Sequence, residues 1–515
     1  MIFSKHFFKN ICNTVSFAYL VILFAVYPFY MKNGYVGIDV AKYKFFLFTS
    51  LGAIVLLLLF GLSELINSVI NRKFGIVNAS ISIFAVVSII SYALSNDKNT
   101  ALVGANGWFM GLSTILIMCV LSFLISILYY PGEYLWYPVL GGSFIVFIIG
   151  ICDRFSFYLI PLSVRDSSFI STIGNINWFM GYYSVIAPLG IFLLMKEFTE
   201  CKNIDVHTLS KAYKCKIWFL IVYTIVTFMS GFVQGSESIL LFYIALFIGS
   251  FILWSMKVIS FESLCSMLFL WGISGQIVKL LRTLFPGGYN YETTGVLSAV
   301  QTGMGTLVAA VLSVIAIYIY KKSQSENKDK VIRILTIILI SLLIVLYVVL
   351  GVLNTLGLLG ESLPYSLLLF DERFGSGRGH AYKAALNTLR NMSPKQLAFG
   401  VGPDCFSSLA YAIPTVRDEL TSVWGDLPLL NTHCELLTML INEGIIGLLS
   451  YLGIFVCSFV AFMKKCKKPE TMCISLAIFC YLVHNLISFS QVVNTPYLFA
   501  LIGVGSGYLL SKEEK

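Results

Sequence analysis

Charged residues are scarce in this chain. Asp, Glu, Lys and Arg make up only 12% of its 515 residues, whereas 58% are hydrophobic, and the mean hydropathy is +0.85. This composition excludes a water-soluble globule and is typical of a protein that crosses a membrane several times. The net charge of +9 then belongs to loops at the membrane surface, and it gives no reason to expect nucleic acid as a partner.

Cysteine motifs are absent as well. No two of the 12 cysteines have C-x-x-C spacing, so the sequence indicates neither a metal site nor a dense disulfide framework. Cys405 and Cys434 are the two cysteines that we expect on the oxidising side of the membrane. Two alternatives stay open for them: a disulfide that ties a loop to the following helix, or two free thiols, which we favour.

Long apolar runs fill most of the chain, and a spanning helix needs roughly 20 mostly apolar residues. Fourteen segments come close to that length: 12–30, 44–64, 74–94, 108–129, 136–151, 177–196, 216–232, 238–258, 262–282, 295–320, 332–354, 435–463, 471–490 and 495–511. We therefore predict an all-α polytopic integral membrane protein with about 14 transmembrane helices. The first run follows Lys5 and Lys9 but lacks a small-residue cleavage site, so we interpret it as a retained helix.

The distribution of Lys and Arg predicts the orientation. If both termini are cytoplasmic, most Lys and Arg residues of the short loops fall on the cytoplasmic side, including the clusters at 321–333 and 464–468. The positive-inside rule favours this arrangement. Both clusters then anchor the protein at lipid headgroups.

The segment 355–434 is the longest polar interval, and we expect it on the outer side. Residues 1–354 would hold eleven spanning helices, 355–434 a large extracytoplasmic lid, and 435–515 the last three helices. Within the lid, 378–389 reads as an amphipathic helix and 400–403 as a turn, while Thr432-x-x-Glu435 reads as a capping box that opens the next span. A loop of this length is usually functional or disordered, and its aromatic and aliphatic residues favour a folded lid.

Several motifs in this region carry a resemblance. They are Arg378-Gly-His-Ala-Tyr-Lys-Ala-Ala-Leu, Gly400-Val-Gly-Pro-Asp-Cys-Phe, His433-Cys-Glu-Leu-Leu and Asn442-Glu-Gly-Ile-Ile-Gly447. In this order they resemble the core of the O-antigen ligase and polysaccharide polymerase superfamily, and Gly174-Asn-Ile-Asn-Trp-Phe179 is similar to the family's Gly-Asn-Pro-Asn element. The matches extend over about residues 160–510. Cys434 stands where the family usually has Asn, and Ser236-Glu237 where a Ser-Arg commonly begins a span.

The resemblance implies a membrane glycosyltransferase of the bacterial cytoplasmic membrane, with its active site on the outer face. Such an enzyme moves a glycan from a polyprenyl-diphosphate donor to a hydroxyl of a glycan, lipid, wall-polymer or protein acceptor. We expect no cofactor. The chain has no Asp-x-Asp pair, so we also expect no metal, and fixed cations must then hold the diphosphate.

Three functions stay open. A ligase transfers a finished glycan, whereas a polymerase joins lipid-linked repeat units. One polymerase subclass carries an Arg followed by ten residues and a Gly, and no Arg in this chain has that spacing, which modestly favours a terminal acceptor. The third function is a transporter or flippase of lipid-linked oligosaccharide, a class that often shows inverted repeats and broken helices. The sequence reveals neither feature.

Arg378 and His433 are the candidate catalytic residues. The planar guanidinium fork of Arg378 suits a diphosphate, although Arg378 could instead pair with Asp371 or Glu372. If Thr432 caps the next helix, His433 takes its first position, where the macrodipole keeps the imidazole neutral and able to accept the acceptor's proton. The alternative for His433 is a polar residue at an interfacial helix end.

Further polar residues are candidates for substrate binding. Arg165 and Lys383, with Lys279 and Arg282, are secondary candidates for the diphosphate or else interfacial anchors. Asn175 and Asn177 either bind sugar or phosphate, or cap a span.

Three more polar residues lie near predicted span ends. Glu435 either caps its helix or acts as a base. Glu237 is a charge within membrane depth, which makes it functional by default although its partner is unknown. We interpret His484 as structural, satisfied by a backbone carbonyl one turn away.

Overall fold

The computed structural model of the chain describes residues 5–70, 75–202, 204–205, 208–291, 298, 303–359, 363, 365–466 and 468–513. Within these residues, ten helices are long and apolar enough to cross a membrane. They are α1 (Lys5–Val21, continued by η1, Ile22–Val26, and η2, Tyr27–Phe29), α2 (Ile38–Ile70), α3 (Gly75–Leu94), α6 (Trp136–Arg154, preceded by η3, Glu133–Leu135), α7 (Ile176–Glu200), α8 (Lys211–Val233), α10 (Phe261–Leu284), α12 (Gly305–Lys322), α13 (Lys328–Thr355) and α18 (Glu435–Ala461, continued by η6, Phe462–Cys466). The chain is therefore a multi-pass membrane protein, as its composition predicts.

Four of the predicted spans fall on shorter apolar helices. These are α5 (Leu112–Leu128), α9 (Ile239–Ser255), α19 (Pro469–His484) and α20 (Thr495–Glu513). The span predicted over 295–320 begins outside the described residues, and the helix described there is α12. Among the described residues outside segment 355–434, the other regular elements are the short helix α4 (Lys98–Val103) and a small antiparallel pair, β1 (Phe169–Ile170) and β2 (Gly174–Asn175).

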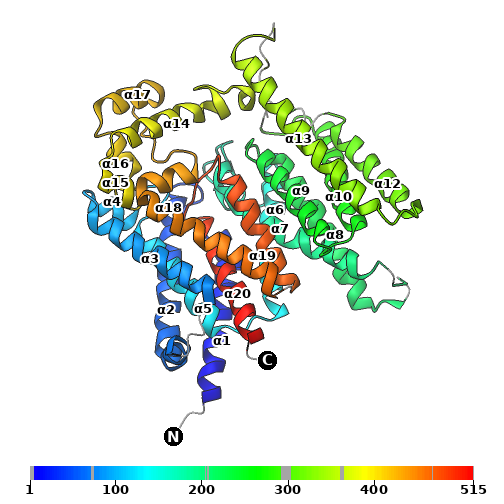
Figure 1. The fold of residues 1–515 in the computed structure, drawn as a ribbon, viewed down its shortest axis with the longest axis horizontal. Coiled ribbons are helices and arrows are strands. Elements are labelled where there is room, and N and C mark those ends of the chain that lie inside the picture. Colours follow the sequence, from blue (N-terminus) through cyan, green and yellow to red (C-terminus); the bar gives the residue numbers. More distant parts are fainter. Residues whose placement is uncertain are drawn as a thin grey trace.

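The helices form a bundle with α7 at its centre and α13 at its edge (Figure 1). The apolar window of α7 is 94% buried, whereas that of α13 is 6% buried. A helix that exposes so many Leu, Ile and Val side chains fits a lipid environment. Small residues bring other helices together: a Cβ on Gly272 of α10 would lie 2.5 Å from the Thr306 carbonyl of α12, a close approach that glycine permits.

A folded lid covers one end of the bundle. It contains η5 (Ser366–Leu368), α14 (Phe374–Arg390), α15 (Pro394–Phe399), α16 (Phe406–Ala410) and α17 (Pro414–Trp424). The amphipathic helix predicted over 378–389 lies within α14, and its Ala381, Ala384 and Ala385 pack with Phe406 and Leu420 in a separate small core. Both chain termini lie at the end of the bundle away from the lid (Figure 1).

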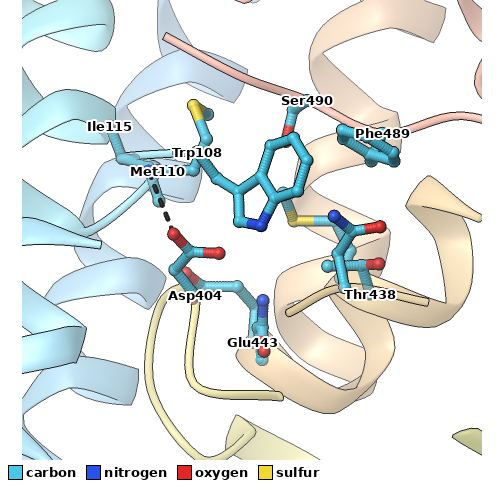
Figure 2. A pocket seen from close by; sticks show the side chains of 11 residues that line it. Trp108, Met110, Ile115, Asp404, Thr438, Glu443, Phe489 and Ser490 are labelled. Carbon is cyan, nitrogen blue, oxygen red and sulfur yellow. Dashed lines mark hydrogen bonds between the residues drawn. The ribbon is translucent and has the colours of Figure 1, made fainter. Parts of the chain in front are cut away.

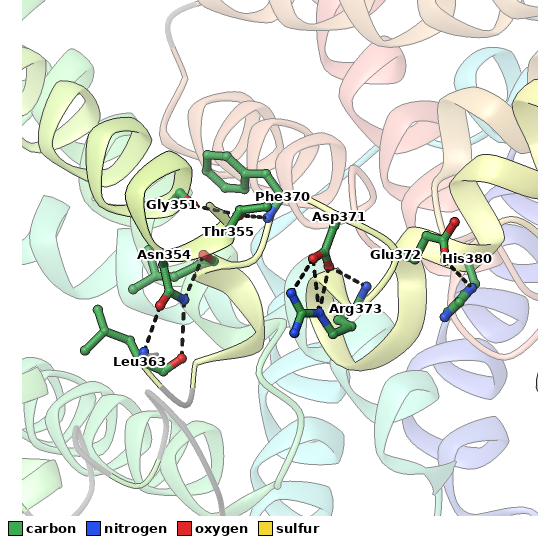
Figure 3. A network of polar contacts seen from close by, with 10 residues as sticks. Gly351, Asn354, Thr355, Leu363, Phe370, Asp371, Glu372, Arg373 and His380 are labelled. Carbon is green, nitrogen blue, oxygen red and sulfur yellow. Dashed lines mark hydrogen bonds and ion pairs between the residues drawn. The ribbon is translucent and has the colours of Figure 1, made fainter. Parts of the chain in front are cut away.

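Asn354, the penultimate residue of α13, holds one end of the lid (Figure 3). Its amide Nδ2 donates to the carbonyls of Leu363 (3.3 Å) and Leu368 (3.2 Å), and its Oδ1 accepts from the Leu363 N–H (2.7 Å). The neighbouring Thr355 hydroxyl accepts from the Phe370 N–H at 2.7 Å. These bonds give partners to backbone groups of the part-buried segment that follows α13.

The turn predicted at 400–403 fastens the other end of the lid to α18. Gly400 and Gly402 have φ values of 79° and 118°, which favour glycine. The Val401 and Gly402 N–H groups donate to the carbonyls of Ile441 (3.1 Å) and Asn442 (2.9 Å). Helix α18 can accept these bonds because it is interrupted directly afterwards.

The interruption lies at Gly444, where φ is 71° and ψ is −177°. A Cβ at this position would collide with the backbone of Ala398, so the close contact between lid and helix requires glycine. The sequence did not reveal this break, and in this respect our prediction of an uninterrupted span was wrong.

Candidate functional site

His433 lies in the connector between the lid and α18, with an unusual positive φ of 53°. Its backbone N–H donates to Asn431 Oδ1 at 2.9 Å, and its ring meets Phe489 edge-on at 5.2 Å. The Tyr382 hydroxyl of α14 donates to its carbonyl at 3.5 Å. Nδ1 of the imidazole is buried and has no hydrogen-bond partner among the described residues, so it is available to a ligand.

The predicted capping box does not form. The Thr432 hydroxyl bonds the Thr438 hydroxyl at 2.8 Å and the Cys434 carbonyl at 2.8 Å, and α18 begins at Glu435 without a side-chain cap. Glu435 Oε2 instead accepts the Ser490 N–H at 2.5 Å, so the prediction that Glu435 caps the helix was wrong. His433 therefore lies outside the helix, and the macrodipole cannot be what tunes it.

Burial tunes His433 instead. Burial, assisted by the positive charge of Arg378, lowers the pKa of His433 to about 3. The imidazole is consequently neutral near pH 7, as predicted, but for a different physical reason.

Arg378 follows a left-handed turn in α14, where Gly375, Ser376 and Gly377 all have positive φ. Its Nη1 donates to the Gly375 carbonyl at 2.6 Å, and its buried Nε has no partner among the described residues. Burial lowers the pKa of the guanidinium, while nearby Tyr382 and Glu237 raise it.

The carboxylates that Arg378 might have used are occupied elsewhere. Asp371 pairs with Arg373 at 2.5 Å, and Glu372 pairs with Lys383 at 2.5 Å (Figure 3 shows the first pair). Neither forms an ion pair with Arg378 among the described residues. The guanidinium therefore keeps hydrogen-bonding capacity for an anion.

Arg378 and His433 lie in the same region of the fold. The positive charge of Arg378 is near enough to lower the pKa of the His433 imidazole. Tyr382, one helical turn after Arg378, reaches the His433 backbone. The cation, Arg378, thus comes from helix α14, and the imidazole, that of His433, comes from the connector before α18.

A chain of polar side chains lies behind this pair. His484 Nε2 is 3.3 Å from the Ser238 hydroxyl, and Ser238 and Ser236 hydroxyls are 2.9 Å apart. Ser236 donates to Asn177 Oδ1 at 3.0 Å, and His484 Nδ1 is 2.9 Å from Asn485 Oδ1. The expectation that a backbone carbonyl satisfies His484 was wrong, since two side chains hold its ring. Arg378 acts electrostatically on His484 too.

Glu237 gains the partners that the sequence could not identify. Its Oε2 accepts from the Ser366 hydroxyl of the lid at 3.1 Å, and its charge acts on Arg378. Glu237 therefore lies at the junction of bundle and lid.

Two of the other predicted cations are held by their own surroundings. Arg165 lies over the Tyr158 ring at 3.6 Å, donates to the Ile160 carbonyl at 2.5 Å and pairs with Asp153 at 3.7 Å. Lys383 pairs with both Glu372 and Glu419, at 2.5 and 3.0 Å.

The remaining polar candidates also have local partners. Asn175 caps α7 by accepting the Asn177 N–H at 2.9 Å. Lys279 contacts the Met304 sulfur at 3.9 Å, and Arg282 lies 4.5 Å from the Tyr289 ring. Among the described contacts, none of these residues reaches Arg378 or His433 directly.

Arg154 is a buried cation that the sequence did not single out. It is 2% exposed and donates to the carbonyls of Ser167 (2.8 Å) and Gln234 (2.7 Å), beneath the Tyr291 ring at 4.5 Å. It thus joins the segment before α7 to the connector that holds Ser236. Its position just after the apolar run 136–151 was the available signal.

The described cysteines are free thiols, Cys405 and Cys434 among them. In the same part of the chain, no group of three or more His, Cys, Asp and Glu residues is placed to hold a metal ion. No protein-family model matches the sequence, and no curated protein is similar to it. The family resemblance therefore stays a hypothesis that depends on the motifs themselves.

Proposed function

We propose that this protein is a membrane glycosyltransferase that moves a glycan from a polyprenyl-diphosphate donor to an acceptor hydroxyl at the outer membrane face. The observation that carries the proposal is the proximity of the two elements that hold Arg378 and His433: the Tyr382 hydroxyl, one helical turn after Arg378, bonds the His433 carbonyl, and the Arg378 charge reaches the His433 imidazole. Both residues lie in the motifs that resemble the O-antigen ligase and polymerase superfamily, although they are distant in sequence.

Arg378 would hold the diphosphate. Cleavage of the glycosyl–phosphate bond builds negative charge on the departing diphosphate, and a fixed guanidinium stabilises that charge. Its unpartnered Nε and its lack of a carboxylate partner within the described residues support this role.

His433 would accept the proton of the acceptor hydroxyl. With a pKa of about 3, the ring is a weak base. Burial is the larger cause of this low pKa and the Arg378 charge the smaller. A bound diphosphate would offset the Arg378 charge and add a negative charge of its own, so donor binding would raise the pKa of His433. We therefore expect the donor to bind before the acceptor is activated.

The arrangement of the lid and termini supports an outward site. They lie at opposite ends of the bundle (Figure 1), and the Lys and Arg clusters at 321–333 and 464–468 favour cytoplasmic termini. The lid and the two catalytic candidates then face outward.

A transporter of lipid-linked oligosaccharide is the second candidate function. The interruption of α18 at Gly444 favours it, because transporters often bind their cargo at broken helices. A folded lid that itself carries a cation, Arg378, close to the connector with a neutral imidazole favours the enzyme.

The decisive experiment uses purified protein and a polyprenyl-diphosphate oligosaccharide. Release of the polyprenyl diphosphate with formation of a new glycosidic bond supports the enzyme; a ladder of products indicates a polymerase and one transferred product a ligase. Movement of intact donor across a vesicle membrane without bond cleavage would support the transporter instead.

Replacing Arg378 tests the diphosphate contact. Because lysine is a point charge without a planar fork, Arg378→Lys should lower donor turnover by about 100-fold. Arg373→Lys is the matched control, since Arg373 lies nearby but is 64% exposed and pairs with Asp371. Full turnover in Arg378→Lys would reduce Arg378 to a structural anchor.

A further inference from the structure

A small enclosed cavity lies beside the candidate active site (Figure 2). Its polar lining includes Trp108, Asp404, Asn431, Asn442, Glu443 and Ser490. The cavity volume of about 10 Å³ gives room for a single particle the size of a water molecule.

Two acceptors in this lining have no hydrogen-bond partner among the described residues. Glu443 is 1% exposed and both of its carboxylate oxygens are unpartnered, and Asn442 is 3% exposed with an unpartnered Oδ1. The Ser88 hydroxyl lies near Glu443 but forms no hydrogen bond of good geometry with it. A buried acceptor is costly unless something donates to it or binds it.

No basic side chain neutralises the carboxylates around the cavity. Within the described part of the chain, the ion pairs include neither Asp404, Glu435 nor Glu443. The N–H groups of Ala105 and Met110 donate to Asp404 Oδ2 at 2.7 and 3.2 Å. Burial raises the pKa of Asp404, and these two hydrogen bonds lower it.

The first half of the broken helix ends at the cavity, where lid N–H groups bond the Ile441 and Asn442 carbonyls and the side chains of Asn442 and Glu443 line the cavity. Because α18 is interrupted at Gly444, Asn442 and Glu443 end its first half. The C-terminal end of a helix favours a cation, and unwound segments of broken membrane helices are known places for small monovalent cations.

We propose that this cavity binds one sodium ion, held by the carboxylate of Glu443 and the amide oxygen of Asn442, with Asp404 supplying further negative charge. Oxygen ligands suit a hard cation, and a water-sized cavity suits a dehydrated ion of small radius. The evidence for this site does not depend on the proposed glycan transfer.

Occupancy of this cavity would also order the catalytic connector. Asn431 lines the cavity and accepts the His433 N–H, and Phe489 lines it and contacts the His433 ring. A bound cation would therefore hold in place the two side chains that contact His433, those of Asn431 and Phe489.

Two other occupants are outcomes of the test. A proton on Glu443 would neutralise the site without a cation. A water molecule would accept from Trp108 Nε1, a donor in the same lining that is also unpartnered, and would donate to Glu443.

The experiment measures equilibrium binding of radiolabelled sodium to the purified wild-type protein, and its thermal unfolding in sodium or choline chloride at equal ionic strength. We expect saturable binding of one sodium ion per chain and an increase in Tm of about 2–4 °C on saturation. Absence of saturable sodium binding would overturn the proposal. A Tm that then depends on pH alone would indicate a proton on Glu443, and a Tm that depends on neither pH nor sodium would indicate a water molecule.

Glu443→Gln supplies the variant test. It removes the charge but keeps the shape, so it should abolish sodium binding and the sodium-dependent change in Tm. Glu262→Gln is the control, because Glu262 is largely buried but paired with Lys202 at 2.7 Å, and it should respond to sodium like the wild type. Wild-type sodium binding that survives in Glu443→Gln would overturn the assignment. If Glu443→Gln fails to fold, binding to the wild-type protein decides.

Discussion

His433 is held in a conformation that its local sequence does not suggest. The capping motif Thr432-x-x-Glu435 predicts a helix start. In the structure the Thr432 hydroxyl instead bonds the Thr438 hydroxyl, and the Glu435 carboxylate accepts from the Ser490 N–H. Ser490 lies 55 residues from Glu435, so this partner arises from tertiary structure, which a local motif cannot encode. The role of His433 stays a prediction. Its lowered pKa has a cause, burial, that became visible only in the fold.

His433→Ala should abolish glycan transfer while leaving the protein folded. Loss of a general base typically costs 10²- to 10⁴-fold in rate, so we expect donor consumption to fall by about 100-fold or more. Turnover of lipid-linked donor by purified protein measures this. His380→Ala is the matched lid control, because the contacts of the His380 ring lie within the lid, with Glu372 at 3.7 Å and the Trp424 ring at 6.2 Å. Near-normal turnover in His433→Ala would remove His433 from the mechanism.

The pH dependence of stability offers a second test at His433. Its pKa is about 3 in the folded protein and about 6.5 in an unfolded chain. Between these values the unfolded chain binds more protons, so stability rises with pH through this window and is lost as pH falls below about 6.5. Asp404, with its pKa raised to about 6, acts in the opposite sense between about 3.8 and 6.

His433→Gln removes the first contribution and keeps the second. Its Tm should therefore fall less than that of the wild type between pH 7 and pH 4.5, as measured by thermal unfolding in the same detergent. Equal acid sensitivity of the two proteins would show that His433 is not the neutral buried group that the geometry indicates.

At the scale of elements, the spanning helices were predictable and their interruptions were not. Apolar length alone located the runs now seen as α2, α7 and α13, because a bilayer demands long apolar segments. The break at Gly444 depends on the approach of Ala398 from the lid, and His484 depends on Ser238 of another segment. Such contacts join residues that are distant in sequence, so no local pattern could reveal them.

The junction between α13 and the lid can be tested at Asn354. Asn354→Ala would leave the Leu363 N–H and two lid carbonyls without their partner. Unsatisfied buried groups cost about 1–3 kcal/mol each, so the lid should detach more readily and become more sensitive to protease. Limited proteolysis of the lid measures this.

Thr355→Ser is the control for that junction, because serine retains the hydroxyl that accepts from Phe370. Its lid should resist protease like the wild type. Equal protease resistance in Asn354→Ala would show that the lid is held by its other contacts, such as the bonds from Val401 and Gly402 to α18.

At the scale of the whole molecule, the proposed chemistry requires the lid to lie outside the cell. Asp418 of α17 is 72% exposed at the side chain and lies in the lid. Cys215 is exposed near the start of α8, beside Lys211, Lys214 and Lys216, and the positive-inside rule favours the cytoplasmic side for this end of the helix. In intact cells, an impermeant maleimide should label Asp418→Cys. Cys215 should react only after permeabilisation, with the parent chain giving the background of the native cysteines. If Cys215 reacted in intact cells and Asp418→Cys reacted only after permeabilisation, Arg378 and His433 would lie on the cytoplasmic side. Both the predicted orientation and the proposed transfer at the outer face would then be wrong.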